Sequence, residues 1–201
     1  MCDLRIGITM RVTEAQHYTE LRSSLAQDWF KFLGETFPHS RWLCLPNIGD
    51  SIKEYLSVWD INAIILSGGD DIGVYPVRDE TEFALLDIAD KEGFKVLGVC
   101  RGLQLMHNWL GGELVRNGAE FENKHKSTRH KILFNNEPHE VNSYHSCTLK
   151  GETAADIIST ADDNSIEAIA YKNMLGVMWH PEREETLPLW QKEFITNFLY
   201  N

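Results

Sequence analysis

The chain has 201 residues, of which 43% are hydrophobic and 24% charged, so it is long enough to bury a core within the usual size of one domain. Its formal net charge of −11 excludes general binding to nucleic acid or to an anionic membrane, because those surfaces attract clustered Lys and Arg and repel an acidic protein. We therefore expect one domain over residues 1–201 that binds a small molecule.

The first half of the sequence alternates between β-rich runs and segments with apolar residues at helical spacing. A strand over residues 4–9 comes first and is followed by a helix over residues 18–35. The pattern then repeats, with strands over 41–46, 63–70 and 95–100 and helices over 51–60 and 80–93. Such alternation predicts βαβ units, which build a mostly parallel sheet with helices on both faces.

After residue 112 the sequence changes to short runs joined by polar turns. The runs at 130–135, 139–146, 166–171 and 175–182 indicate strands of mixed or antiparallel type, and a closing helix is expected over 187–200. No internal repeat, low-complexity stretch or Pro/Gly/Ser linker marks a second domain. The predicted fold class is α/β, with a mostly parallel central sheet flanked by helices and a smaller set of antiparallel strands in the C-terminal half.

The sequence gives no sign of an export signal, a membrane anchor or a metal-binding motif. The N-terminal residues lack a basic region followed by a long apolar stretch, and no run of about 18 apolar residues occurs, which predicts a cytoplasmic protein. The four cysteines stand far apart without a C-x-x-C pair, so we expect reduced thiols, no metal and no cofactor. These cysteines are Cys2, Cys44, Cys100 and Cys147, and we interpret Cys44 and Cys147 as packing residues.

Cys100 stands where an apolar run ends and a helical pattern begins. In a parallel α/β sheet the ligand site lies beyond the carboxyl ends of the strands, which is where this cysteine falls. Residues 98–102, GVCRG, have the form of a sharp strand-to-helix turn that presents a nucleophile and tolerates only small flanking residues. The helix N-terminus favours thiolate and directs a backbone N–H toward a developing oxyanion. The alternative is a buried thiol between two ordinary glycines.

A cysteine nucleophile needs a histidine base and a group that orients the histidine. Of the eight histidines, only His180 directly follows a strand-like run and has a carboxylate, Glu182, two residues further on. Pro181 stiffens the link between them by fixing its own φ angle. Taken alone, this segment could equally be a surface turn, but together with the turn at Cys100 it indicates a Cys-His-Glu arrangement.

Three segments, GVCRGLQLMHNWLGG, HPERE and SGGDDIGVYPVRDETEFALLDIA, resemble the class I, or triad, glutamine amidotransferases. The third is similar to their free-standing γ-glutamyl hydrolase branch, which includes γ-glutamyl-γ-aminobutyrate hydrolase, and the similarity covers nearly the whole chain. The resemblance implies hydrolysis of a γ-glutamyl amide through a glutamyl-thioester. By this resemblance Cys100 is the nucleophile, His180 the base and then the acid, and Glu182 the carboxylate that holds the imidazole.

The same resemblance implies further positions around the substrate. The backbone N–H groups of Gly69 and Arg101 form the oxyanion hole, and Gln104 touches the α-groups of the glutamyl moiety. The segment VNSYH completes the glutamyl pocket. Its side chains near the substrate are Ser143, Tyr144 and His145.

The leaving amine is less well defined by the sequence. His107 stands where the family usually has Asn, and the glutamine that often follows the VNSYH histidine is missing. Residues 122–131, ENKHKSTRHK, form a basic run that is either a solvated loop or a phosphate clamp made by Lys124, Lys126 and Arg129. A narrower resemblance implies a phosphate- or nucleotide-bearing amine such as CDP-amidate, of the kind used in capsular polysaccharide phosphoramidate synthesis.

Three other functions stay open. A glutaminase subunit would deliver ammonia to a synthetase partner and be stimulated by it. A different enzyme with the same cysteine turn is disfavoured, because such enzymes lack the HPE segment after VNSYH. A non-enzymatic binding protein would survive Cys100→Ala without functional loss. The sequence does not fix the oligomeric state, for which a homodimer is one arrangement.

Overall fold

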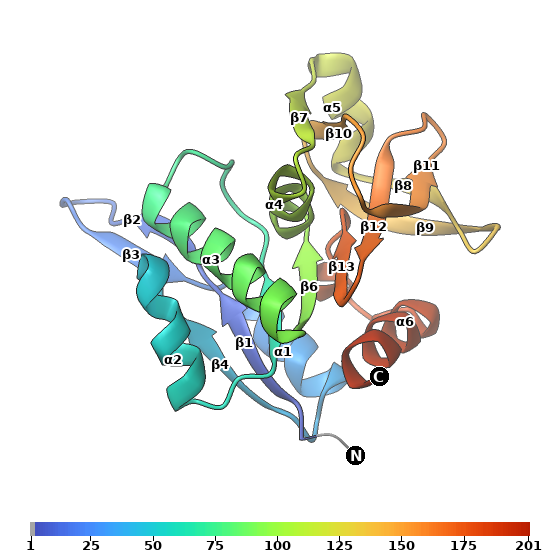
Figure 1. Cartoon of the computed structure of the whole chain (residues 1–201). Coiled ribbons are helices and arrows are strands. Elements are labelled where there is room, and N and C mark those ends of the chain that lie inside the picture. The colour runs from blue at the N-terminus through green and yellow to red at the C-terminus, as the bar shows by residue number, and fades with distance from the viewer. Residues whose placement is uncertain (1–2) are drawn as a thin grey trace.

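The computed structural model describes residues 3–201, so Cys2 lies outside the described residues. Within this range a nine-stranded sheet has the order β4-β1-β5-β6-β13-β12-β11-β8-β9 (Figure 1). The first five strands in this order, β4, β1, β5, β6 and β13, pair parallel with one another. The remaining pairs, from β13–β12 to β8–β9, are antiparallel. This arrangement confirms the predicted α/β class. In sheet order the bounds are Arg41–Leu45, Arg5–Thr9, Ala63–Leu66, Lys95–Val99, Met174–Val177, Ile166–Tyr171, Asp156–Ala161, Lys126–Phe134 and Glu137–Tyr144.

Helices cover both faces of the parallel half. The helices α1 and α6 pack on one face through apolar side chains such as Trp29 and Ile195, and α2, α3 and α4 pack on the other through side chains such as Leu56 and Leu85 (Figure 1). In the described part of the chain, none of the helices has the length and apolar character that crossing a membrane requires. The bounds are α1 Gln27–Thr36, α2 Ile52–Val58, α3 Pro76–Glu92, α4 Arg101–Trp109, α5 Ala119–His125 and α6 Leu189–Tyr200.

The predicted helix over residues 18–35 is wrong in its first part. Residues Leu21–Ser24 form the strand β3, which pairs antiparallel with β2, Arg11–Glu14, and the helix begins only at Gln27. The side chain of Leu21 is exposed, so it never joined the apolar face that the helical spacing suggested. The buried face starts at Trp29, where the spacing of the apolar residues becomes helical in the structure too.

The C-terminal half contains elements that the sequence pattern did not reveal. These are the helix α5, the strand β11, and the two-stranded sheet of β7, Glu113–Arg116, with β10, Cys147–Lys150. The basic run over 122–131 is not a loop, because it forms the end of α5 and the first part of β8. Most of its side chains are exposed, so the sequence shows no regular spacing of apolar residues that would indicate a helix or a strand.

Three neighbouring parallel strands place the predicted site at one edge of the sheet. The strands β5, β6 and β13 pair in the registers Leu66 with Gly98 and Val99 with Val177. The residues that follow their carboxyl ends therefore meet in space, although they are far apart in the sequence. They include Gly68, Cys100 and His180.

Candidate active site

Cys100 occupies a strained turn between β6 and α4. Its φ of 52° and ψ of −101° lie in a region that non-glycine residues rarely adopt. A Cβ atom on Gly98 would approach the carbonyl carbon of Gly102 to 2.7 Å, and one on Gly102 would approach the Leu66 oxygen to 2.3 Å. Both flanking glycines are therefore required for the helix to leave the strand so sharply. The Cys100 N–H donates to the Val177 oxygen at 2.8 Å, which fixes the turn to β13.

His180 and Glu182 follow β13 and are both buried. The distance from His180 Nδ1 to Glu182 Oε1 is 2.7 Å. Because an ionised carboxylate only accepts hydrogen bonds, Nδ1 carries the proton and Nε2 is the nitrogen left for exchanging a proton with a reacting group. Asn142 on β9 clamps the backbone of this histidine: it accepts from the His180 N–H and donates to the His180 oxygen, each at 2.8 Å.

The electrostatics of Cys100 and His180 favour an ion pair. Burial alone would raise the pKa of Cys100, but the charge and hydrogen bond of His180 outweigh it and lower the pKa below the ordinary value. Burial alone would likewise lower the pKa of His180, yet the charges of Glu182 and Cys100 raise it to about 9. Both shifts favour the thiolate–imidazolium pair, which is the reactive form of a catalytic cysteine.

The SGG segment lies against this pair. A Cβ atom on Gly68 would be 2.8 Å from His180 Cε1 and 3.8 Å from Cys100 Cβ, so a side chain there would collide with the histidine ring. Gly69 has a φ of +141°, and a Cβ atom there would lie 2.5 Å from Arg78 Nη1. Arg101 is the first residue of α4 and directly follows Cys100, and Gly69 follows Gly68 on the loop after β5. Their role as oxyanion donors stays a prediction.

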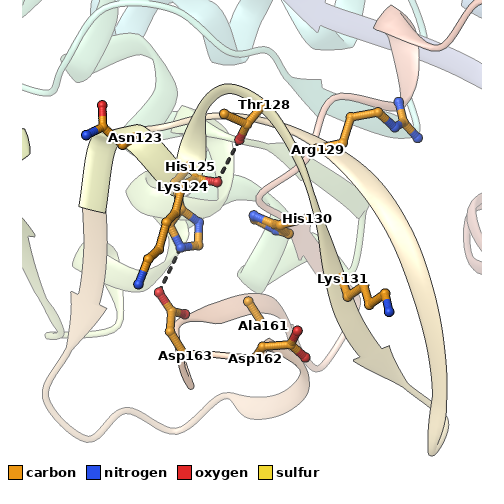
Figure 2. Close-up of a pocket in the computed structure, with 10 residues that line it drawn as sticks. All are labelled: Asn123, Lys124, His125, Thr128, Arg129, His130, Lys131, Ala161, Asp162 and Asp163. Atoms are coloured by element: carbon orange, nitrogen blue, oxygen red, sulfur yellow. Dashed lines mark hydrogen bonds and ion pairs between the residues drawn. The ribbon is translucent and has the colours of Figure 1, made fainter. Parts of the chain in front are cut away.

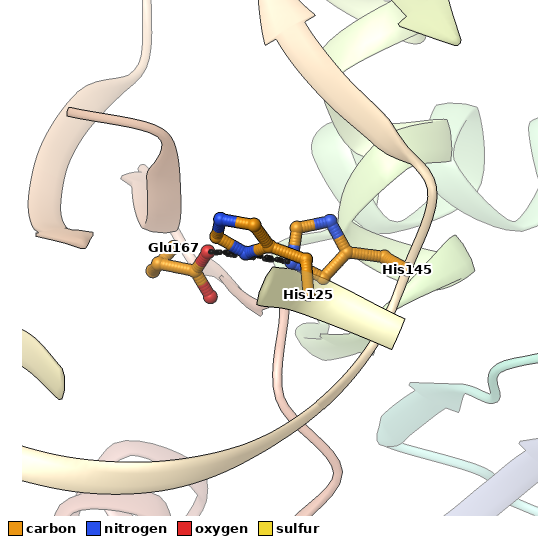
Figure 3. A group of neighbouring side chains, drawn as sticks. All are labelled: His125, His145 and Glu167. Atoms are coloured by element: carbon orange, nitrogen blue, oxygen red, sulfur yellow. Dashed lines mark hydrogen bonds and ion pairs between the residues drawn. The ribbon is translucent and has the colours of Figure 1, made fainter. Parts of the chain in front are cut away.

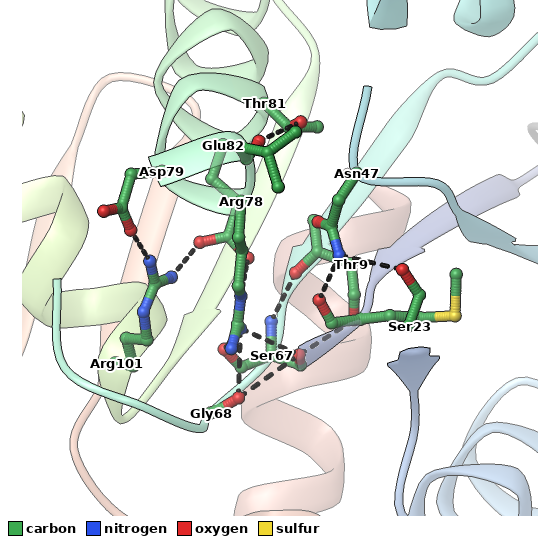
Figure 4. Close-up of polar contacts among 12 residues, drawn as sticks. Thr9, Ser23, Asn47, Ser67, Gly68, Arg78, Asp79, Thr81, Glu82 and Arg101 are labelled. Carbon is green, nitrogen blue, oxygen red and sulfur yellow. Dashed lines mark hydrogen bonds and ion pairs between the residues drawn. The ribbon is translucent and has the colours of Figure 1, made fainter. Parts of the chain in front are cut away.

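A buried ionic network holds that loop in place (Figure 4). Arg78 on α3 donates to the oxygens of Ser67 at 2.9 Å and of Gly68 at 3.0 Å, and its Nε donates to Glu82 at 3.0 Å. The Arg101 side chain pairs with Glu82 and with Asp79. Sequence reasoning missed these α3 residues, although the (i, i+4) spacing of Arg78 and Glu82 is a usable signal.

The VNSYH segment at the end of β9 lies beside His180 and Cys100. The Tyr144 ring meets the His180 ring edge to face with centroids 5.3 Å apart, and His145 is buried close enough for its charge to lower the pKa of Cys100. Ser143 donates its hydroxyl to the His125 oxygen at 2.6 Å, so this hydroxyl holds the backbone. Gln104 on α4 is buried with its amide 3.7 Å from the sulfur of Met178.

The cations of the basic run are not equivalent. Arg129 is 2.8 Å from Glu140 and 3.0 Å from Glu184, and Lys126 is 3.4 Å from Glu122, so both already have carboxylate partners. Lys124 and Arg129 line a cavity of about 470 Å³, which Lys126 does not border (Figure 2). The structure therefore does not bring the three cations together as one clamp.

His107 packs inside the fold rather than near the substrate. Its Nε2 is 2.7 Å from the Lys150 oxygen, which ties α4 to β10, and Gly112 leaves room for its ring. Among the described residues, Cys44 and Cys147 have free thiols, and burial raises the pKa of each. Neither thiol has the lowered pKa that distinguishes Cys100.

Comparison with known proteins identifies the family. The profile described as peptidase C26 matches residues 5–182. The chain belongs to the peptidase C26 family of class I glutamine amidotransferases. It is therefore a cysteine-dependent amide hydrolase, as the sequence predicted.

Individual relatives refine this picture. A γ-glutamyl-CDP-amidate hydrolase from Campylobacter jejuni is 34% identical over 90% of this chain and 92% of that protein. One subunit of the glutamine-hydrolysing GMP synthase from Methanocaldococcus jannaschii is 32% identical over 73% of this chain and 77% of the relative. Among solved structures, a candidate GMP synthase subunit from Thermoplasma acidophilum superimposes with a TM-score of 0.71 at 15% identity, covering 100% of this chain and 94% of the other. The last likeness supports the fold alone.

Proposed function

We propose that this chain hydrolyses the γ-glutamyl amide bond of a small molecule, with Cys100 as nucleophile, His180 as base and acid, and Glu182 as the group that orients His180. The observation that carries this proposal is the strained Cys100 turn beside a buried His180–Glu182 pair with a 2.7 Å hydrogen bond. Strain and shifted pKa values gather at catalytic sites because reactivity depends on them.

The proposed reaction has two halves. The Cys100 thiolate attacks the γ-carbonyl carbon, and the negative charge on oxygen is met by the backbone N–H groups of Gly69 and Arg101. The C–N bond then breaks as the His180 imidazolium gives its proton to the departing amine, which leaves a glutamyl-thioester on Cys100. In the second half, His180 takes a proton from water, the resulting hydroxide attacks the thioester, and glutamate leaves as the thiolate is restored.

For the leaving group we propose a phosphate- or nucleotide-bearing amine such as CDP-amidate. The support is the likeness to the Campylobacter jejuni enzyme along nearly the whole of both chains. The cavity of about 470 Å³ adds cationic groups around His125 (Figure 2), whose Nδ1 is 3.2 Å from His145 Nε2. Within the described part of the chain neither Lys124 nor Lys131, which both line this cavity, forms an ion pair, so these two cations are the ones best able to meet a phosphate.

Two other functions have support of their own. The GMP synthase relatives favour a glutaminase subunit that delivers ammonia to a synthetase partner. The free-standing form of the family pattern favours hydrolysis of a substrate without phosphate, such as γ-glutamyl-γ-aminobutyrate. These alternatives share the chemistry at Cys100 and differ only in the amine that leaves.

A panel of γ-glutamyl amides tests the choice. Purified chain is incubated with a γ-glutamyl phosphoramidate, a γ-glutamyl-nucleotide amidate, γ-glutamyl-γ-aminobutyrate and glutamine, and the release of glutamate is followed with Cys100→Ala as the blank. The proposal expects the highest kcat/KM for the phosphate-bearing compounds. Higher kcat/KM for glutamine, with stimulation by an added synthetase, would instead establish the glutaminase role.

A further inference from the structure

A second cluster of titratable side chains includes His145, the last residue of the VNSYH segment (Figure 3). His125 ends α5, His145 follows β9 and Glu167 lies on β12, and all three are buried. The His125 Nδ1 atom is 3.2 Å from His145 Nε2 and 3.8 Å from Glu167 Oε1, and His145 Nε2 is 3.4 Å from that same oxygen. Three potential ligand atoms from distant parts of the chain thus face one point.

The hydrogen bonds on the far sides of the two rings fix their protons. His145 Nδ1 is 2.9 Å from the Cys147 oxygen, and His125 Nε2 is 2.8 Å from Asp163 Oδ2. Both partners accept hydrogen bonds only, so these outer nitrogens carry protons, and in the neutral rings the inner nitrogens present lone pairs. Metal-binding histidines are held in this way, with the second nitrogen donating to a carboxylate or a backbone carbonyl.

Hydrogen bonds from Ser165 fix the position of the Asp163 carboxylate. Its Oδ1 accepts from the Ser165 N–H at 3.1 Å and from the Ser165 hydroxyl at 2.7 Å. Together with the hydrogen bond to His125 Nε2, these contacts fix the carboxylate in the orientation that holds the His125 ring.

The spacing of the three atoms matches a zinc ion. Bonds of 2.0–2.2 Å at tetrahedral angles place neighbouring ligand atoms roughly 3.4 Å apart. The observed separations of 3.2, 3.4 and 3.8 Å bracket that value. Calcium and magnesium prefer sites built from oxygen, which two imidazoles do not provide. A set of two imidazoles and one carboxylate is typical of zinc sites with a fourth position for water.

The surroundings supply an entry route and a further contact. His125 and Asp163 line the cavity of about 470 Å³, which opens to solvent beside the cluster (Figure 2). Glu167 Oε2 is buried and accepts no hydrogen bond from the described residues. His130 Nε2 lies 3.4 Å from this oxygen and is placed to hold the carboxylate as it turns toward an ion.

We propose that His125, His145 and Glu167 bind one Zn²⁺ ion, which fastens the end of VNSYH to β12 and holds His145 neutral beside Cys100. The sequence alone predicts no metal, because the cysteines lack a metal-binding spacing. The proposed ligands are instead two histidines and a glutamate, 20 and 22 residues apart, which the fold brings together. The site does not depend on which γ-glutamyl compound is cleaved.

Zinc uptake by Cys100→Ser tests the site, because this change removes the catalytic thiol as a competing ligand. The full-length variant is stripped with a chelator, supplied with ZnCl2, dialysed, and analysed for bound zinc by mass spectrometry. One ion per chain is expected. Adding Glu167→Gln or His125→Asn should abolish uptake, and adding Asp163→Asn should weaken zinc affinity roughly 10- to 100-fold. Adding His39→Asn, at an exposed histidine, is the matched control and should change nothing.

Cobalt provides a second measurement that does not require any variant of the cluster to fold. Co²⁺ added to the stripped Cys100→Ser protein should give the intense visible bands of tetrahedral coordination. The proposal is overturned if the protein takes up neither metal. It is also overturned if a folded Glu167→Gln variant, checked by circular dichroism, keeps zinc as tightly as the parent. In either case the cluster shares a proton instead of a metal.

Discussion

Glu182→Gln is the sharpest perturbation of the proposed catalytic pair. The change keeps the shape of the side chain and one oxygen able to accept from His180 Nδ1, but it removes the negative charge. That charge is the largest of the effects that raise the pKa of His180, against the burial that lowers it. Without it the imidazolium loses its main support, so the thiolate on Cys100 loses its partner.

The structure sets the scale of the effect. The pKa of His180 is raised from 6.5 to about 9. A difference of this size is worth about 3 kcal/mol, because each pKa unit corresponds to ~1.4 kcal/mol. Both groups are almost fully buried, so little of this energy is screened by water. If Glu182 supplies most of it, kcat/KM near neutral pH should fall by roughly 10²-fold.

The assay is the pH dependence of kcat/KM. In the parent enzyme the acidic limb reports formation of the Cys100 thiolate, and the alkaline limb, near pH 9, reports loss of the His180 proton. Glu182→Gln lowers the pKa of His180, so its alkaline limb should move to lower pH. Glu185→Gln, at an exposed carboxylate on the same segment, is the control. An unchanged alkaline limb in Glu182→Gln, together with a rate close to that of the parent, would refute the reasoning.

Three further predictions concern the turn, the thiols and the basic run. Gly102→Ala should destabilise the fold by about 1–3 kcal/mol in a denaturant melt, because its Cβ would lie 2.3 Å from the Leu66 oxygen. Gly34→Ala is the control, at a helix position where no atom would lie within 4 Å of the new Cβ, and it should stabilise the fold by about 0.5–1 kcal/mol. At neutral pH an alkylating reagent should modify Cys100 before Cys44 and Cys147, whose pKa values are raised, and mass spectrometry of digests would show any other order. Lys124→Ala should raise KM for a phosphate-bearing substrate more than Arg129→Ala does, because Arg129 already has carboxylate partners. Neither change should alter KM for γ-glutamyl-γ-aminobutyrate, which carries no phosphate.

Periodicity predicted the parallel half of the fold because its strands and helices bury clear apolar faces. The run over 63–66 is buried at every position, as a central parallel strand should be. The same reasoning failed at residues 18–24, where exposed side chains in the β2–β3 hairpin follow a helical spacing by accident. It also missed α5 and the polar start of β8, whose side chains face solvent and carry little pattern.

The candidate site divides along similar lines. Cys100 and His180 are visible in the sequence because Cys100 directly follows β6 and His180 comes three residues after the end of β13, at the edge where parallel strands end. Asn142 and Arg78 support them from other elements, and their roles depend on contacts that no local spacing encodes. The proposed zinc ligands are a stronger case, since His125, His145 and Glu167 come together only after β12, β11, β8 and β9 have joined in one sheet.

The most direct test of the central claim is to trap the glutamyl group on the enzyme. The protein is mixed with a γ-glutamyl amide, quenched in acid within the first turnover, digested and analysed by mass spectrometry, with Cys100→Ala treated in parallel. The account predicts one glutamyl adduct, located on Cys100 and absent from the variant. An adduct on Cys44 or Cys147, or continued release of glutamate by Cys100→Ala at the parent rate, would contradict it.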